Sequence, residues 1–304
     1  MELHWQPDPG RAQLERAALS QFLGSELPEI LKCDAVELER ELGGDLSHPA
    51  AFALAWAKAN GAPLTLSKSD LLGTVQESRR RAGDVAERVG FAVDLTPLEE
   101  TVIAPTIERH ISIARQAGDV ETLVFHTPEQ LSCYGFLRQA HGLIVDHWPA
   151  MLEEIRTTVT CLSFFTAGNA IGFADICTHG LICLRADDLS NVTGLAEEII
   201  HESSHVRLNG ILASTTCLED DDGRLYRTPL REDPRPAAGL LHQLFVLARL
   251  CDWHARLGTR AITERAERAM QDLEAAYTTV QNELPLTAAG RELVSTIKPA
   301  RHVR

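Results

Sequence analysis

The most informative stretch of this 304-residue chain reads Leu195-Ala-Glu-Glu-Ile-Ile-His201-Glu202-Ser203-Ser204-His205. It contains His-Glu-x-x-His, and residues four apart on a helix are neighbours, so both imidazoles can reach one metal ion just off the helix surface. Glu202 would lie beside that ion without binding it. Apolar residues at helical intervals predict a single helix over about 194–213. The other interpretation is an exposed amphipathic helix whose His and Glu side chains only face water.

His242 is the predicted third ligand. It lies near the start of a strongly apolar helix expected over 239–258, and a polar residue among aliphatic ones needs a partner, which a metal would supply. The alternative is a core histidine that hydrogen-bonds to backbone. Other ligand layouts are less favourable, because Leu208 and Ile211 stand where an extended motif needs Gly and His, and Glu219 belongs to an acidic, turn-like segment. Three imidazoles would leave coordination positions open, as catalysis requires.

A proline-containing linker is expected between the two helices, over residues 226–236. It carries Arg227, Arg231 and Arg235 next to Tyr226, in a connection that must pass close to the metal. Arginine can clamp a carboxylate bidentately, so these side chains could bind an acidic cosubstrate. They could equally pair with the acidic residues nearby and hold the loop.

Composition narrows the possible partners and location. A net charge of −14 and a pI near 5.3 argue against a nucleic-acid partner, which would need a basic face. The seven cysteines are scattered, with no Cys-x-x-Cys pair, which argues against a structural zinc site and indicates free thiols. No secretory signal and no long apolar run is found, so we expect a cytoplasmic protein without a membrane partner.

The pattern of apolar residues predicts an α+β fold that is predominantly helical. Residues 1–118 form a helical region, and residues 119–304 an α+β catalytic region whose small sheet packs on the metal-binding helix; the two could also be one continuous domain. Expected helices span 11–22, 49–60, 71–89, 97–117, 147–155, 239–258 and 261–284, and expected strands 122–125, 157–165 and 181–184. The run Arg79-Arg80-Arg81 is expected to be a solvated helix face and not a binding patch.

Three blocks in this order resemble a known family. They read His201-Glu-Ser-Ser-His205-Val-Arg-Leu-Asn209, Tyr226-Arg-Thr-Pro-Leu-Arg231-Glu-Asp233-Pro-Arg235-Pro236 and Gly239-Leu-Leu-His242-Gln-Leu-Phe245. Their succession is similar to that of the HExxH-motif peptide-modification proteins of ribosomal peptide natural-product pathways. The similarity covers about 195–250.

The resemblance implies an iron(II)- and 2-oxoglutarate-dependent oxygenase that uses O2 to hydroxylate the β-carbon of a residue in a precursor peptide. His201, His205 and His242 would hold the iron. Arg235 would bind a 2-oxoglutarate carboxylate, with Arg231 as second choice. Where the family commonly has an aromatic residue before the first loop arginine, this chain has Leu230.

Two other functions remain open. In a zinc metallopeptidase or other hydrolase, Glu202 would be the general base that activates a zinc-bound water. In the oxygenase it would only orient a ligand or the substrate. The third possibility is a metal-containing peptide-binding protein without turnover.

Overall fold

A computed structural model describes residues 3–62, 66–95, 102–103, 123–166, 172–187, 189–219, 223–228, 231–258 and 263–297 of the chain; the side chains of residues 228, 231–233 and 263 are not described. The fold is α+β and predominantly helical, as the sequence predicts. Across these ranges, no helix combines the length and apolarity needed to cross a membrane.

Four helices form the first part of the chain: α1 (Pro9–Leu31), α2 (Ala35–Glu41), α3 (Pro49–Asn60) and α4 (Lys68–Val89). Side-chain caps fix their starts, since Asp8, Asp34 and Ser67 each accept a hydrogen bond from the first turn. Three of these helices were predicted, whereas the short α2 was not. The helix predicted over 97–117 lies almost wholly outside the described residues.

A four-stranded mixed sheet follows, with the strand order β1-β2-β4-β3. Its strands are β1 (Val124–His126), β2 (Cys161–Thr166), β3 (Gly172–Phe173) and β4 (Leu181–Arg185), and only the β2–β4 pair is parallel. The strand predicted from residue 157 starts too early, because Thr157 and Thr158 end a helix. Their hydroxyls donate to the carbonyls of Glu153 and Glu154, one turn back, as Ser and Thr side chains do within helices.

Both faces of the central strands β2 and β4 are buried. On β2, Cys161 and Phe165 pack with residues of α1, α3 and α4, whereas Leu162 and Phe164 face the opposite core, which α7, α8 and α9 cover. This alternation follows from the two-residue period of a strand. Residues before and after position 118 share both cores, so the hydrophobic core is continuous across that position.

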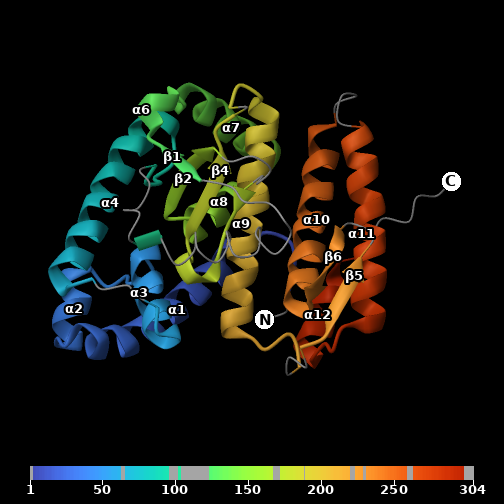
Figure 1. The fold of residues 1–304 in the computed structure, drawn as a ribbon. Coiled ribbons are helices and arrows are strands. Elements are labelled where there is room, and N and C mark those ends of the chain that lie inside the picture. The colour runs from blue at the N-terminus through green and yellow to red at the C-terminus, as the bar shows by residue number, and fades with distance from the viewer. Residues whose placement is uncertain are drawn as a thin grey trace.

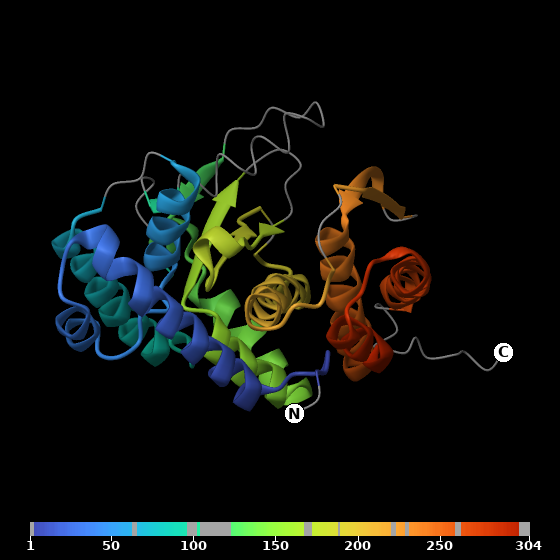
Figure 2. The ribbon, with the colours of Figure 1, turned by 90° about the horizontal axis from the view of Figure 1, so that it is seen from below.

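The remaining elements are mostly helical. They are α6 (Pro128–Leu131), α7 (Tyr134–His147), α8 (Pro149–Thr158), the short 3-10 helix η1 (Ile176–Thr178), α9 (Val192–Ser214), α10 (Ala237–Leu257), α11 (Thr263–Glu283) and α12 (Ala288–Thr296). Figures 1 and 2 show α9 in the middle of the molecule, with the sheet and the first helices on one side and α10 to α12 on the other. The third core cluster lies between α9 and these last helices.

The segment 226–236 is not the simple linker that its prolines suggested. It belongs to a hairpin of β5 (Leu225–Thr228) and β6 (Arg231–Pro236), whose register is irregular between Tyr226 and Thr228. Proline is tolerated at such an edge, where its missing N–H is not needed for a ladder bond. The hairpin leads directly into α10, so Arg235 lies just before the helix that carries His242.

Candidate metal centre

Helices α9 and α10 bring the three predicted histidines together. The two helices run antiparallel, because Glu197 meets His254 at one end of their contact while His205 meets His242 at the other. Their apolar residues drive the packing, with Leu208 and Leu244 both buried in the core between them. His201 and His205 lie one turn apart on α9, as the motif requires.

The imidazole nitrogens lie close to one another. His201 Nε2 is 3.3 Å from His205 Nε2, and His205 Nδ1 is 3.0 Å from His242 Nδ1. Two nitrogen ligands at about 2.0–2.1 Å from one ion would be roughly 3.0–3.5 Å apart. The nitrogen spacing in each pair suits two ligands of one ion and equally suits a hydrogen bond between neutral imidazoles.

The two contacts of His205 use different ring nitrogens, however, so the three rings form a chain and do not converge on one point. Within the parts of the chain that the structure describes, no group of three or more His, Cys, Asp or Glu side chains is arranged to hold a metal ion. His201 and His205 fit one ion as they stand. In the structure, His242 contacts the other ring nitrogen of His205, so a third-ligand role would require its ring to be reoriented.

Burial keeps the imidazoles of His201 and His242 neutral, the form that binds metals. It lowers the pKa of His201 to about 4, against the opposing charge of Glu197, and it lowers the pKa of His242 to about 4, against the charge of Asp175. His201 still exposes 35 % of its side chain, so the centre is reachable from solvent.

Glu202 lies beside this centre but faces away from open solvent. Its Oε1 is 3.9 Å from His201 Nε2, and only 3 % of its side chain is exposed. The carboxylate packs against Gly172 of β3 at a place where any Cβ would lie 2.7 Å from Oε1. Its other oxygen has no hydrogen-bond partner among the described residues. Burial, with a contribution from Glu198, raises the pKa of Glu202, so the group tends to hold its proton.

Sequence reasoning missed two contributors to this centre. Glu197, one turn before His201, accepts a hydrogen bond from His254 Nε2 at 3.1 Å and lies within 3.5 Å of Arg265. Its four-residue spacing from His201 was a usable signal. Asp175, which caps η1 by accepting from the Cys177 N–H at 3.0 Å, acts on His242 from a distant loop and left no local signal.

The residues predicted to bind a cosubstrate all lie on the hairpin. Tyr226 is buried in the third core cluster, where the Arg224 guanidinium lies 4.7 Å from its ring centroid. Arg227 is exposed, and Arg235 is half-buried with its side-chain carbons close to Gly239 of α10. The side chain of Arg231 lies outside the described residues. Of the two predicted arginines with described side chains, Arg235 is the one that packs against the helix of His242.

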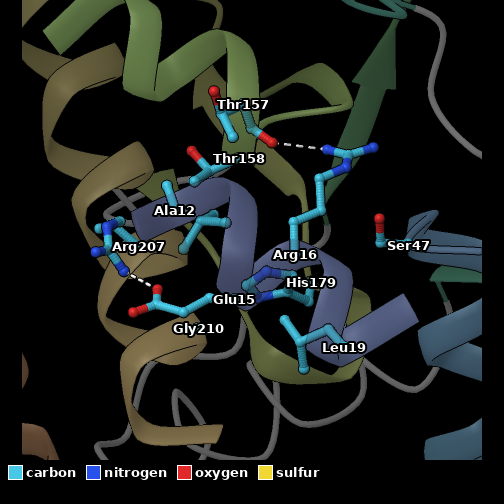
Figure 3. Close-up of a pocket in the computed structure, with 11 residues that line it drawn as sticks. Ala12, Glu15, Arg16, Leu19, Ser47, Thr157, Thr158, His179, Arg207 and Gly210 are labelled. Carbon is cyan, nitrogen blue, oxygen red and sulfur yellow. Dashed lines mark hydrogen bonds and ion pairs between the residues drawn. The ribbon is translucent and has the colours of Figure 1, made fainter. Parts of the chain in front are cut away.

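A small cavity lies between α1 and α9, where Glu15, His179 and Arg207 line it (Figure 3). It measures about 10 Å³, which is room for roughly one water molecule. This cavity is too small for a substrate. The cysteines that the structure describes are free thiols, as expected from the sequence.

Comparison with known proteins does not identify a function for this chain. No protein-family model matches the chain, and no curated protein matches its sequence.

Proposed function

We propose that this protein is an iron(II)- and 2-oxoglutarate-dependent oxygenase that hydroxylates the β-carbon of a residue in a ribosomally made precursor peptide. The observation that carries the proposal is the contact of His205 with both His201 and His242, at 3.3 and 3.0 Å between ring nitrogens. Neutral imidazoles are ligands that suit iron as well as zinc. The order of the three sequence blocks, which resembles the peptide-modification family, supplies the choice of iron and 2-oxoglutarate.

Each residue has a defined part in this proposal. His201, His205 and His242 would hold the metal, and Arg235 would bind a cosubstrate carboxylate from the start of α10. Iron with 2-oxoglutarate and O2 supplies the oxidation: one oxygen atom enters the peptide C–H bond, and 2-oxoglutarate becomes succinate and CO2. The burial of Glu202 against Gly172 argues against a base in an open cleft, and in this proposal Glu202 takes a supporting position beside His201.

The test is aerobic incubation with iron(II), 2-oxoglutarate and candidate precursor peptides. Succinate should form in step with a peptide product that has gained one oxygen atom. Peptide cleavage with zinc under nitrogen would instead support the hydrolase, for which the 3.9 Å approach of Glu202 to His201 is the structural argument. Bound metal without either activity would support a peptide-binding protein without turnover.

The metal assignment has its own prediction. His242→Ala should lose bound iron as completely as His201→Ala, because both rings would be ligands. Iron content after gel filtration, determined by mass spectrometry of the element, measures this. The exposed His4 is the matched control, and His4→Ala should keep its iron. If His242→Ala also keeps its iron, His242 is not a ligand.

Arg235 should govern the need for the cosubstrate. Arg235→Ala should raise the 2-oxoglutarate concentration needed for half-maximal succinate formation about tenfold or more, since a charge-assisted hydrogen bond contributes about 1.5–3 kcal/mol. Its iron content should stay unchanged. Arg227→Ala, on the same hairpin and exposed, serves as the comparison; a larger effect there would transfer the role to Arg227.

A further inference from the structure

A pocket of about 300 Å³ lies between α1, α4 and α8, next to the start of β2. None of these elements carries His201, His205 or His242, so the pocket is separate from the metal centre. Arginines from three helices line it: Arg16 from α1, Arg79 from α4 and Arg156 from α8. Three guanidinium groups around one pocket are unexpected in a chain with a net charge of −14.

Two of these arginines are held in place by neighbouring groups. Arg16 donates to the carboxylate of Asp45 from Nε and Nη2, at 3.0 and 2.8 Å, and its Nη1 donates to the Thr157 carbonyl at 2.8 Å. Arg156 pairs with Glu153 and also donates to the Gly90 carbonyl at 3.0 Å. Such contacts fix the orientation of the guanidinium groups before any ligand arrives.

Arg79 differs from its neighbours. Its Nη2 donates to the Asp45 carbonyl at 2.9 Å, but it forms no ion pair with any carboxylate that the structure describes. The adjacent Arg80 pairs with Glu77 and Asp84, and Arg81 pairs with the buried Asp94. Of the three consecutive arginines on α4, the one that lines the pocket is thus the one whose charge no described carboxylate balances.

The arginines also act on two histidines outside the lining of the pocket, His48 and His141. Burial is the main cause that lowers the pKa of His48 to about 4; the charge of Asp94 opposes this shift, and Arg79 and Arg16 add to it. Burial and then Arg156 lower the pKa of His141. Since Asp45 and Glu153 balance Arg16 and Arg156, Arg79 supplies the positive charge at the pocket that no described carboxylate balances.

The rest of the lining has two parts. Gln13 and Thr160 offer an amide and a hydroxyl next to the arginines, whereas Ala82, Ala92 and Val159 offer an apolar wall. A volume of about 300 Å³ stands at the small end of ligand-binding sites, larger than a lone anion requires. The pocket can thus hold an anionic head together with a small organic group.

We propose that this pocket binds the phosphoryl group of a small organic phosphate. Guanidinium donors that approach from three helices suit a tetrahedral dianion, which presents oxygens in several directions, better than they suit a planar carboxylate. The apolar wall would contact the organic part. The proposal concerns binding only and does not depend on the function proposed for the histidines.

Titration calorimetry on the full chain tests the proposal, with phenyl phosphate, inorganic phosphate and malonate as probes at one ionic strength. Phenyl phosphate should bind most tightly, because it fills both parts of the pocket, and inorganic phosphate should bind more tightly than malonate. Malonate binding as tightly as phenyl phosphate would overturn the choice of a phosphoryl group. The absence of any phosphate binding would overturn the site itself.

Two substitutions one residue apart locate the site. Arg79→Gln should weaken phenyl phosphate binding about tenfold or more, since it removes a charge-assisted contact. Arg80→Gln removes the same charge from the same helix outside the pocket and should change affinity less than twofold. Equal effects of both would show that only the general charge matters and would overturn the proposal.

A third variant keeps the test valid should Arg79→Gln fold poorly. Ala82→Leu fills the apolar part of the pocket with a residue that favours helix, so it should weaken phenyl phosphate binding more than inorganic phosphate binding. Circular dichroism and the thermal midpoint of each ligand-free variant check the fold. If Ala82→Leu leaves the preference for phenyl phosphate unchanged, the ligand does not occupy this pocket.

Discussion

Glycine at position 172 allows Glu202 to approach the sheet. A Cβ there would lie 2.7 Å from Glu202 Oε1, closer than real Cβ contacts come, and 3.1 Å from the Cys183 carbonyl oxygen, which is tighter than most. The residue identity at one position of β3 therefore decides where a buried carboxylate beside the metal centre can lie. Gly172 and Glu202 are far apart in the sequence, so only the fold brings them together.

Gly172→Ala should lower the free energy of unfolding by about 1–3 kcal/mol, because the new methyl group forces Glu202 or the strand to shift. Urea unfolding measures the change. Gly83→Ala is the control: Gly83 lies in α4 with open space around it, and alanine there should stabilise the protein by about 0.5–1 kcal/mol. If the free energy of unfolding of Gly172→Ala were as high as that of Gly83→Ala, the close packing of Glu202 on Gly172 would be contradicted.

At the scale of elements, a buried ion network joins the helices that surround α9. Glu154 of α8 accepts from Arg207 of α9 at 3.1 Å, from the Asp8 N–H at 2.8 Å and from Arg249 of α10. Arg207 also pairs with Glu15 of α1. One glutamate thus links α8, α9, α10 and the start of α1, which fixes the helices whose packing brings His205 to His242.

Glu154→Gln should destabilise the protein by about 3–5 kcal/mol, since it leaves two buried guanidinium groups short of negative charge. Glu153→Gln is the adjacent control. Glu153 is exposed and pairs only with the exposed Arg156, so its loss should cost about 0–1 kcal/mol. Chemical unfolding of both variants compares them, and similar midpoints would show that the network contributes little to stability.

At the scale of the whole molecule, buried histidines should make stability depend on pH. Burial lowers the pKa of His179 to about 3, with Arg16 and Arg207 adding to the effect, so the folded protein holds this ring neutral. The unfolded chain takes up a proton at its ordinary pKa near 6.5. The contribution of neutral His179 to the free energy of unfolding is therefore fully present above pH 6.5 and is lost as the pH falls toward 3.

Between pH 7 and pH 5 this one group should remove about 2 kcal/mol from the free energy of unfolding. His179→Gln should therefore show a smaller loss than the parent protein over that interval, whereas the exposed His4→Gln should follow the parent. Urea titrations at the two pH values give the difference. Glu198 and Glu202, whose pKa values burial raises, act in the opposite sense, so the comparison between variants is the informative quantity. Equal losses in His179→Gln and the parent would contradict the prediction.

The sequence alone determined the local structure and the chemistry of single segments. The period of apolar residues gave α3 its observed bounds and placed the core of α9, α10 and β4, because helix and strand periods follow from backbone geometry. It also placed His201 and His205 one turn apart. The hairpin 225–236 was missed, since its prolines and charges mask the alternation of a strand.

Only the tertiary structure decided which distant groups meet. His205 contacts His242 because α9 and α10 pack antiparallel at one particular register, and Asp175 acts on His242 through a loop far away in the chain. Tertiary packing likewise decides the surroundings of the three consecutive arginines on α4. Arg80 is solvated as predicted, whereas Arg81 binds buried Asp94 and Arg79 lines a pocket. Such contacts depend on how helices and the sheet pack over long sequence separations, which the period of a single segment does not encode.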